Sequence, residues 1–545
     1  MTLPRRAGAC ALLLTATACF PPGEGRDPPL ERVYFPVGLA LDDARTRLFV
    51  VSSDFDLQYN GGAVHAFDLE RLRGRVPQVC AGDADCPSSQ RCDDVETAQN
   101  GGIPSFWCVD REGPRAGAPC GALRERSAAN RWLEPGRCEY LSAVSPQDGG
   151  EPIQVDAVGI GAFATDVLYR AAPPDAAGGD LTGRLFVPVR GDATLHVIDI
   201  RAGDGRLWCG QDRNEGKCAD AYRAGDDPET ENTRDLRMPP EPFAIDATAD
   251  GEAIAVTHQT DGSVSLFVND WERPARLEFV AAGLPQRVVG IAAIPEPAVV
   301  AATGYDYRPG FLTTFRDSPE VRLLRFYDDI DPTSPSSVRR PFLEQSGGVV
   351  ITANATGYDS RGIAIDAGPR RACEVACAGE PACLGECAGI PLGVFVSNRS
   401  PDSLLVGATR PDATPTSSDD LPIFYDSVPV PVGASRVVVG QVVDAAGRLA
   451  SRVFVLCFDQ RRLVIYDPVA RRIEKTVTTG RGPHAFVVDA TDAADGGGPT
   501  SRSFGYLAHF TDSYLAVVDL DQRHHRTYGE IVLTIGNPVP PRANK

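Results

Sequence analysis

The chain has 545 residues, and its 54 glycines and 45 prolines favour short strands joined by turns over long helices. Its formal net charge of −19 gives an acidic surface that repels polyanions, so we expect no nucleic-acid partner. The length allows two to four ordinary domains or one large repeat fold.

The N-terminus predicts export. A basic start precedes an apolar run from Ala7 to Ala18, which is too short to span a bilayer. The run ends in Ala-Thr-Ala-Cys at Cys19 and resembles a bacterial lipobox. The resemblance implies a signal peptide over 1–18, diacylation of Cys19 and a Pro-rich tether over 19–32. Phe20 is not the acidic residue that would retain such a lipoprotein at the inner membrane, so we expect outer-membrane anchoring.

An ordinary secretory signal with an incidental cysteine is the alternative interpretation of this segment. Both interpretations predict an exported protein. Only the lipobox interpretation predicts contact with the membrane through a lipid anchor.

Paired strands are predicted from Val33 to about Pro538. The stretch GRLFVPVRGDATLHVIDI, Gly183 to Ile200, shows the pattern of a hydrophobic strand, a polar turn, an alternating strand and an acidic residue. The first strands of such pairs begin at Arg47, Arg184, Ala253, Ala298, Gly393, Arg452 and Phe504. The second strands begin at Ala63, Thr194, Ser263, Val321, Ser403, Arg462 and Tyr514.

A third apolar strand precedes most pairs, as in PVGLALDDARTR and SRGIAIDAGPRR, and ends in a turn rich in Asp and Gly. A fourth strand is clearest in RRIEKTVTTG and GEIVLTIGNP. Four short antiparallel strands repeated seven times are the unit of a propeller, so we predict an all-β, seven-bladed β-propeller over residues 33–540. Two β-sandwiches joined by a Cys-rich module would not explain seven copies of one pattern.

The recurring RLFV, VIDI and TIG-NP segments resemble those of the YVTN/NHL-type propellers of bacterial envelopes. The Gly-His and Trp-Asp signature of WD40 arrays is absent from the sequence. The resemblance implies an envelope propeller, and the uneven spacing of the pairs predicts Cys-rich insertions over 78–140 and 371–390.

Cysteine usage also indicates export. Of 15 cysteines, Cys10 falls in the signal, Cys19 is the lipid site and Cys457 lies in a predicted strand as a buried thiol. The other twelve form local groups and predict about six disulfides within those groups: Cys80, Cys86, Cys92, Cys108, Cys120, Cys138, Cys209, Cys218, Cys373, Cys377, Cys383 and Cys387. For the last four we expect a stapled helical hairpin with pairs Cys373–Cys387 and Cys377–Cys383. Zinc is the competing interpretation, but their spacing is not that of a zinc knuckle.

Motifs of catalytic and cofactor sites are missing from the sequence. It contains no HExxH, GxSxG, CxxCH or Walker pattern, so we expect no catalytic residue, no metal and no cofactor. GIGAFA, from Gly159, mimics a dinucleotide fingerprint but lies in β-like sequence. His65 and His196 hold the same position of two second strands and are expected to be repeat residues rather than ligands.

One constellation lies at the predicted axis, where the innermost strands of a propeller begin. Aligning the starts of these strands places Val37, Phe243, Arg287, Arg361, Arg436 and His484 at one position. The four basic residues, Arg287, Arg361, Arg436 and His484, are the candidate ligand-binding residues. The arginines either pair with rim aspartates such as Asp54, Asp306 and Asp459, or form a cationic funnel for an anionic ligand.

We therefore expect a binding or scaffolding protein of the cell envelope whose partner is an envelope protein or an anionic ligand. The alternative is a propeller hydrolase or lactonase, which needs an acid/base or metal cluster on the axis. Its side chains would be those of His258, Asn398, Asp459 and His509, so their convergence would favour an enzyme and their scatter would exclude this cluster.

Overall fold

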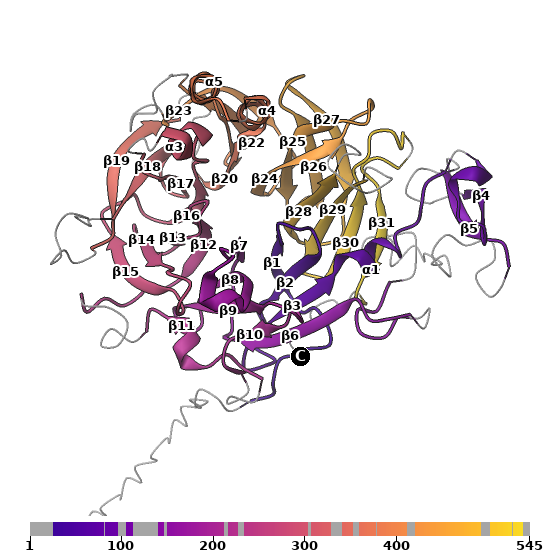
Figure 1. Cartoon of the computed structure of the whole chain (residues 1–545), viewed down its shortest axis with the longest axis horizontal. Helices are drawn as coiled ribbons and strands as arrows, with labels where there is room; N and C mark the ends of the chain where they lie inside the picture. Colours follow the sequence, from indigo (N-terminus) through magenta and orange to yellow (C-terminus); the bar gives the residue numbers. More distant parts are fainter. Residues whose placement is uncertain are drawn as a thin grey trace, which may run out of the picture.

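Seven antiparallel sheets surround a central axis, and the chain visits them in order around the ring (Figure 1). This computed structural model describes residues 25–80, 82–95, 105–112, 140–146, 150–211, 216–226, 234–303, 307–328, 340–351, 359–377, 379–410, 420–491, 502–525 and 527–537. The protein is a seven-bladed β-propeller, as the repeated strand pairs predict. The predicted signal peptide, Cys19 and Asp306 lie outside the described residues.

Each blade is built from one continuous part of the chain, and its strands run in sequence order from the axis outward. Blade 1 contains β1 (Pro36–Leu41), β2 (Arg47–Ser52), β3 (Gly62–Asp68) and β6 (Gln154–Ile160). Blade 2 contains β7 (Leu168–Ala171), β8 (Leu181–Val189), β9 (Thr194–Arg201) and β10 (Leu207–Trp208), with β11 (Arg223–Ala224) also paired to β9. Blade 3 contains β12 (Pro242–Ala247), β13 (Ala253–His258), β14 (Val264–Val268) and β15 (Arg276–Ala281).

The remaining four blades follow the same plan. Blade 4 contains β16 (Val288–Ala293), β17 (Gly310–Phe315), β18 (Glu320–Tyr327) and β19 (Phe342–Val350). Blade 5 contains β20 (Ser360–Asp366), β21 (Gly393–Arg399), β22 (Asp402–Thr409) and β23 (Pro422–Pro429). Blade 6 contains β24 (Ala434–Val443), β25 (Leu449–Cys457), β26 (Arg462–Asp467) and β27 (Arg472–Thr478). Blade 7 contains β28 (Pro483–Thr491), β29 (Arg502–His509), β30 (Tyr514–Asp519) and β31 (Ile531–Ile535).

The hydrophobic core is divided into seven layers, one between each pair of neighbouring blades. The layer between blades 7 and 1, for example, packs Leu48 and Val50 of β2 against Leu515 and Val517 of β30. A single blade therefore buries its faces only when both neighbours are present, which is why the ring must close.

The recurring Arg and Asp of the repeat form a pair across the hairpin of the second and third strands. Arg47 lies 3.0 Å from Asp68 and Arg184 lies 2.6 Å from Asp199, in blades 1 and 2. In blade 6 the corresponding Arg452 lies 3.4 Å from Asp467. In these three blades the segment supplies both partners of one cross-strand ion pair.

One predicted strand is wrong. The apolar segment that begins at Ala298 forms a short helix, α3 (Ala298–Thr303), and the second strand of blade 4 is β17 instead. A short apolar run cannot be assigned to strand or helix by its periodicity alone. Here the helix is held by its surroundings, since Ala298 and Val299 pack on the cysteine-stapled helices described next.

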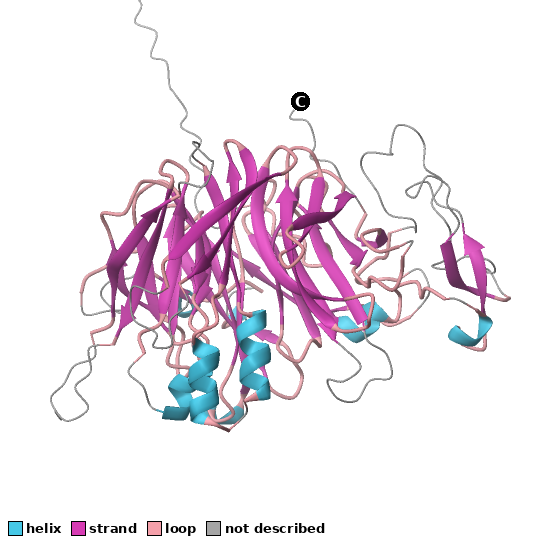
Figure 2. Ribbon diagram, turned by 90° about the horizontal axis from the view of Figure 1, so that it is seen from above, coloured by secondary structure: helices cyan, strands magenta, loops and turns pink. Residues whose placement is uncertain are grey.

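Helices α4 (Gly368–Ala376) and α5 (Pro381–Ala388) form the predicted insertion at 371–390. They connect the first strand of blade 5 to the second and so lie at the opposite end of the ring from the β2–β3 and β29–β30 turns. Figure 2 shows helices gathered at one end of the strands. Disulfides join Cys373 to Cys387 and Cys377 to Cys383, which is the pairing that the helical spacing predicts.

The other disulfides of the described residues also stay within their local groups. They join Cys80 to Cys92, Cys86 to Cys108 and Cys209 to Cys218. Cys120 and Cys138 lie outside the described residues. Cys457 is buried in β25 as a free thiol. Disulfides on this scale indicate an exported protein.

The insertion at 78–140 carries a hairpin, β4 (Gln90–Val95) and β5 (Ser105–Asp110), that projects from the ring in Figure 1. It is not an isolated appendage. Trp107 of β5 is fully buried in the same hydrophobic cluster as strands of blades 7 and 1. The chain that returns from the insertion donates from Leu141 N–H to the Thr534 carbonyl, 2.8 Å away, and so extends the sheet of blade 7. Within the described residues, no helix is long and apolar enough to cross a membrane.

Candidate functional site

An irregularity at the start of the inner strands aims side chains at the axis. In β1, β12, β16, β20, β24 and β28 the register with the second strand slips after the first paired residue. Such a β-bulge re-aims the extra residue. The residues at the slip are Val37, Phe243 with Ala244, Val289, Arg361, Ser435 and His484. The alignment of strand starts is therefore wrong for Arg287 and Arg436, since Val289 and Ser435 hold the equivalent position.

At this end of the channel lies a cavity of about 480 Å³, which we name the upper chamber. Its volume is in the range of sites that hold small molecules. Arg361, Arg436 and His484 line the chamber, but Arg287 does not. Arg287 lies just before β16 with a φ of 59°, its side chain is half exposed, and its Nε is 3.4 Å from Asp317 Oδ2 on the rim.

Four arginines and one carboxylate line the upper chamber: Arg190, Arg361, Arg399, Arg436 and Asp166. Arg436 of blade 6 reaches across the channel to Asp166 of blade 2, with 2.6 Å between Nη2 and Oδ2. Burial raises the pKa of Asp166 even though Arg436 acts in the opposite direction.

The other three arginines pair with acids that lie outside the chamber lining. Arg361 donates to Asp359 over 2.8 Å, and the same carboxylate is 3.2 Å from Arg316 Nε. Arg399 pairs with Asp459, and Arg190 pairs with Glu241. Of the two interpretations of the axial arginines, these contacts fit the one in which each arginine pairs with an acid. Asp54 was one of the expected partners, but it accepts a hydrogen bond from the Tyr59 N–H instead.

His484 does not add to the positive charge of the chamber. Burial lowers its pKa to about 4, so the ring is neutral at physiological pH. Its Nδ1 lies 3.0 Å from the Val37 carbonyl, which joins blade 7 to blade 1 where the ring closes. Its ring lies 5.6 Å from that of Phe510, so His484 belongs to an aromatic wall of the chamber.

The chamber residues that the alignment of strand starts did not find lie at the last residue of a second strand or directly after it. Arg190 and Arg399 come at or next to the last residue of β8 and β21, and Phe458 and Phe510 follow β25 and β29 directly. The repeat pattern contains this signal, because the same turn recurs in each blade.

The four side chains that an enzyme would need do not form a cluster. His258 of blade 3 uses both ring nitrogens on the Pro240 carbonyl and Ser265 Oγ, and His509 of blade 7 accepts from the Gly480 N–H. Asn398 donates to the Pro401 carbonyl, and none of the four lines the upper chamber. In the part of the chain that the structure describes, groups with metal-coordinating geometry consist of disulfide cysteines.

His65 and His196 occupy the same register position, opposite Val50 and Val187, as expected of repeat residues. Both are buried within their blades. His65 Nε2 lies 3.1 Å from Ser52 Oγ, and His196 Nε2 lies 3.2 Å from Asp192 Oδ2.

The opposite end of the channel has a different character. It forms a second cavity of about 630 Å³, lined by Asp42, Asp43 and Asp366 together with Arg45 and Arg371. Val438 of β24 lines both cavities, so they adjoin along the inner strands. Of the two cavities, only the upper chamber has more arginines than carboxylates among its lining residues.

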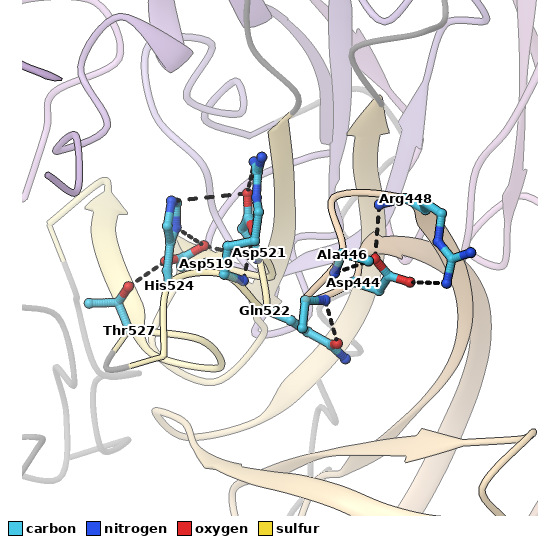
Figure 3. Close-up of polar contacts among 10 residues, drawn as sticks. Asp444, Ala446, Arg448, Asp519, Asp521, Gln522, His524 and Thr527 are labelled. Carbon is cyan, nitrogen blue, oxygen red and sulfur yellow. Dashed lines mark hydrogen bonds and ion pairs between the residues drawn. The ribbon is translucent and has the colours of Figure 1, made fainter. Parts of the chain in front are cut away.

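A further cluster of titratable groups lies in the β30–β31 turn (Figure 3). Asp519 Oδ2 accepts from His524 Nδ1 at 2.9 Å and from Thr527 Oγ1 at 2.6 Å, and Asp521 forms a two-pronged bond with Arg523. Gln522 accepts from Ala445 N–H in the neighbouring blade 6. Asp519 and Asp521 make these hydrogen bonds and ion pairs within the turn. The cluster therefore stabilises the turn and is not an open binding site.

Comparison with known proteins identifies no relative whose function could be transferred. No family model and no curated protein matches the chain. Among solved structures the chain is similar to Sqt1 of Saccharomyces cerevisiae, with 8% identity, a TM-score of 0.42 and coverage of 95% of this chain and 90% of that chain.

Two bacterial structures are similar to the same degree. A protein from Lactobacillus plantarum has 13% identity and a TM-score of 0.39, with 83% of this chain and 86% of that chain covered. A candidate 6-phosphogluconolactonase from Bacteroides uniformis has 12% identity and a TM-score of 0.39, with 82% and 86% covered. Likenesses at this level carry no argument about function.

Proposed function

We propose that the protein is an exported binding module of the cell envelope that takes an anionic ligand in its upper chamber. The observation that carries the proposal is the gathering of arginine side chains in one cavity of an acidic protein, with the acid partners of three of them outside the lining. A chain with a net charge of −19 lines the chamber with four arginines and one aspartate.

The arginines are held in place before any ligand arrives. Asp359 orients Arg361, and Asp166 orients Arg436 across the channel. A carboxylate or phosphate would compete with Asp166 for Arg436 and would add a second, forked contact at Arg361. Because the site is concave and partly buried, such contacts are stronger there than on an open surface.

The hydrolase or lactonase alternative gains no support from the described residues. It depended on His258, Asn398, Asp459 and His509 meeting at the axis, and each of them is bonded within or beside its own blade. We therefore prefer binding to catalysis.

The location of the protein in the cell envelope is part of the same proposal. The lipobox-like sequence at Cys19 and the YVTN/NHL-type strand pattern favour a bacterial lipoprotein at the outer membrane. The disulfides support export.

A thermal-unfolding experiment with citrate tests the anion site. Ligands that bind only the folded state raise the melting temperature, so citrate should raise that of the full chain above its value in sodium chloride of equal ionic strength. The rise should vanish in the double variant Arg361→Gln/Arg436→Gln and persist in Arg287→Gln, whose arginine lies outside the chamber. An equal response in all three proteins, or no response in the parent, would contradict the proposal.

A further inference from the structure

An arc of phenylalanine rings lies along one wall of the upper chamber. Neighbouring ring centroids are 6.3 Å apart for Phe458 and Phe510, 5.2 Å for Phe510 and Phe55, and 6.1 Å for Phe55 and Phe163. All four rings line the cavity. They come from blades 6, 7, 1 and 2, so the arc follows more than half of the ring.

The arc and two of the arginines belong to different parts of the ring. Arg361 and Arg399 are contributed by blade 5, which is not one of the four blades of the arc. Arg436 comes from the adjacent blade 6, so these three arginines form a cationic side next to the aromatic side, while Arg190 comes from blade 2 at the other end of the arc. Below both, Leu39, Ile245 and Ile363 of the inner strands give it an aliphatic floor.

The aromatic side is accessible to water in the described structure. Phe55 is 52% exposed, and Phe163, Phe458 and Phe510 are only partly buried. Large apolar side chains that remain open in a concave site contribute little to folding and mark a binding surface. Edge-to-face contacts between Phe55 and its neighbours hold the rings in fixed positions.

From these two sides we infer that the ligand of the upper chamber is an amphiphilic anion, in which one carboxylate or phosphate group is joined to an aliphatic or aromatic body. The acid group binds Arg361 and Arg436, and the body covers the phenylalanine arc. This inference rests on the proposed anion-binding function and adds the second half of the ligand.

Calorimetric titration of the full chain with a matched set of small molecules tests the inference. Octanoate carries both halves, acetate carries only the acid, and octanol carries only the body. Each methylene buried should tighten binding by up to about fourfold, so octanoate should bind far more tightly than acetate. Loss of the charged hydrogen bonds should make octanol at least about tenfold weaker than octanoate. Monooctyl phosphate, compared with octanoate, shows which acid group the arginines prefer.

Two variants locate the apolar half. Phe55→Ser removes an exposed ring of the arc and should weaken octanoate by about five- to tenfold while leaving acetate unchanged. Phe106→Ser is the matched control, since Phe106 is 42% exposed but lies on the projecting β5 hairpin. It should bind octanoate as the parent does.

The outcomes separate the two proposals. If octanoate binds no better than acetate while citrate still depends on Arg361 and Arg436, the amphiphile inference is wrong and the anion site stands. If octanol binds as well as octanoate, the acid group adds nothing and the amphiphile inference is wrong. If no anion binds at all, both proposals fail. Equal weakening by Phe55→Ser and Phe106→Ser would also overturn the inference.

Discussion

At the scale of single residues, burial decides what the recurring Arg–Asp pair is worth. The Arg184 and Asp199 side chains are only 2% and 9% exposed, and Arg184 also bonds to the Arg273 carbonyl. In Arg47 and Asp68, at the same place in blade 1, the exposed fractions are 25% and 16%. Arg184→Leu strands a buried carboxylate and should lower the free energy of unfolding by about 3–5 kcal/mol. Arg47→Leu leaves its partner in contact with water and should cost about 1 kcal/mol or less. Denaturant unfolding of the two variants checks this, and equal losses would contradict it.

At the scale of elements, the β30–β31 turn in Figure 3 should respond to pH through His524. Burial acts to lower the pKa of His524, but the hydrogen bond to Asp519 and the charges of Asp519 and Asp521 outweigh it, so the pKa is raised. The unfolded chain has the ordinary value near about 6.5. Stability from the charged ring is therefore complete below that pH and is lost as pH rises through the higher folded pKa. His524→Asn should cost most at pH 6 and progressively less toward pH 9.

The comparison with the parent protein isolates this effect. Burial lowers the pKa of His65, His258 and His484 to about 4, so the stability of both proteins falls as pH drops below about 6.5. That loss cancels in the difference between parent and variant. Urea unfolding at three pH values gives the difference directly, and a gap that stays constant or widens with pH would show that His524 is not charged by its neighbours.

The limits of prediction from sequence are visible at this same scale. Alternation and Asp/Gly turns identify most strands, but the short apolar run at Ala298 forms α3 because only packing distinguishes helix from strand there. The β-bulge that puts Val289 rather than Arg287 on the axis leaves no mark in hydrophobic pattern. The aromatic arc joins turns from opposite ends of the chain, Phe55 and Phe510 among them, and only closure of the ring brings these together.

At the scale of the whole molecule, the start of the described chain lies beside the mouth of the channel. Asn60, in the turn that carries Phe55, donates to the Arg26 carbonyl over 2.9 Å. The six residues from Cys19 to 24 can span at most about 20 Å. A lipid on Cys19 would therefore hold the channel mouth close to the membrane. Cys19→Ser should release the protein from membranes and abolish its acylation, as fractionation and labelling with a radioactive fatty acid would show. Retention of an acylated variant would contradict the anchor.

The central claim is that the upper chamber binds an anion between arginines and phenylalanines. The most direct measurement is anomalous X-ray diffraction from crystals of the protein grown with 4-bromobenzoate, whose bromine and carboxylate mark the two ends of the ligand. We predict one dominant bromine peak against Phe163, Phe55 or Phe510, with the carboxylate at Arg361 and Arg436 and Asp166 displaced from Arg436. A bromine peak at the opposite cavity or on the outer blades, with the upper chamber free of ligand density, would contradict the account.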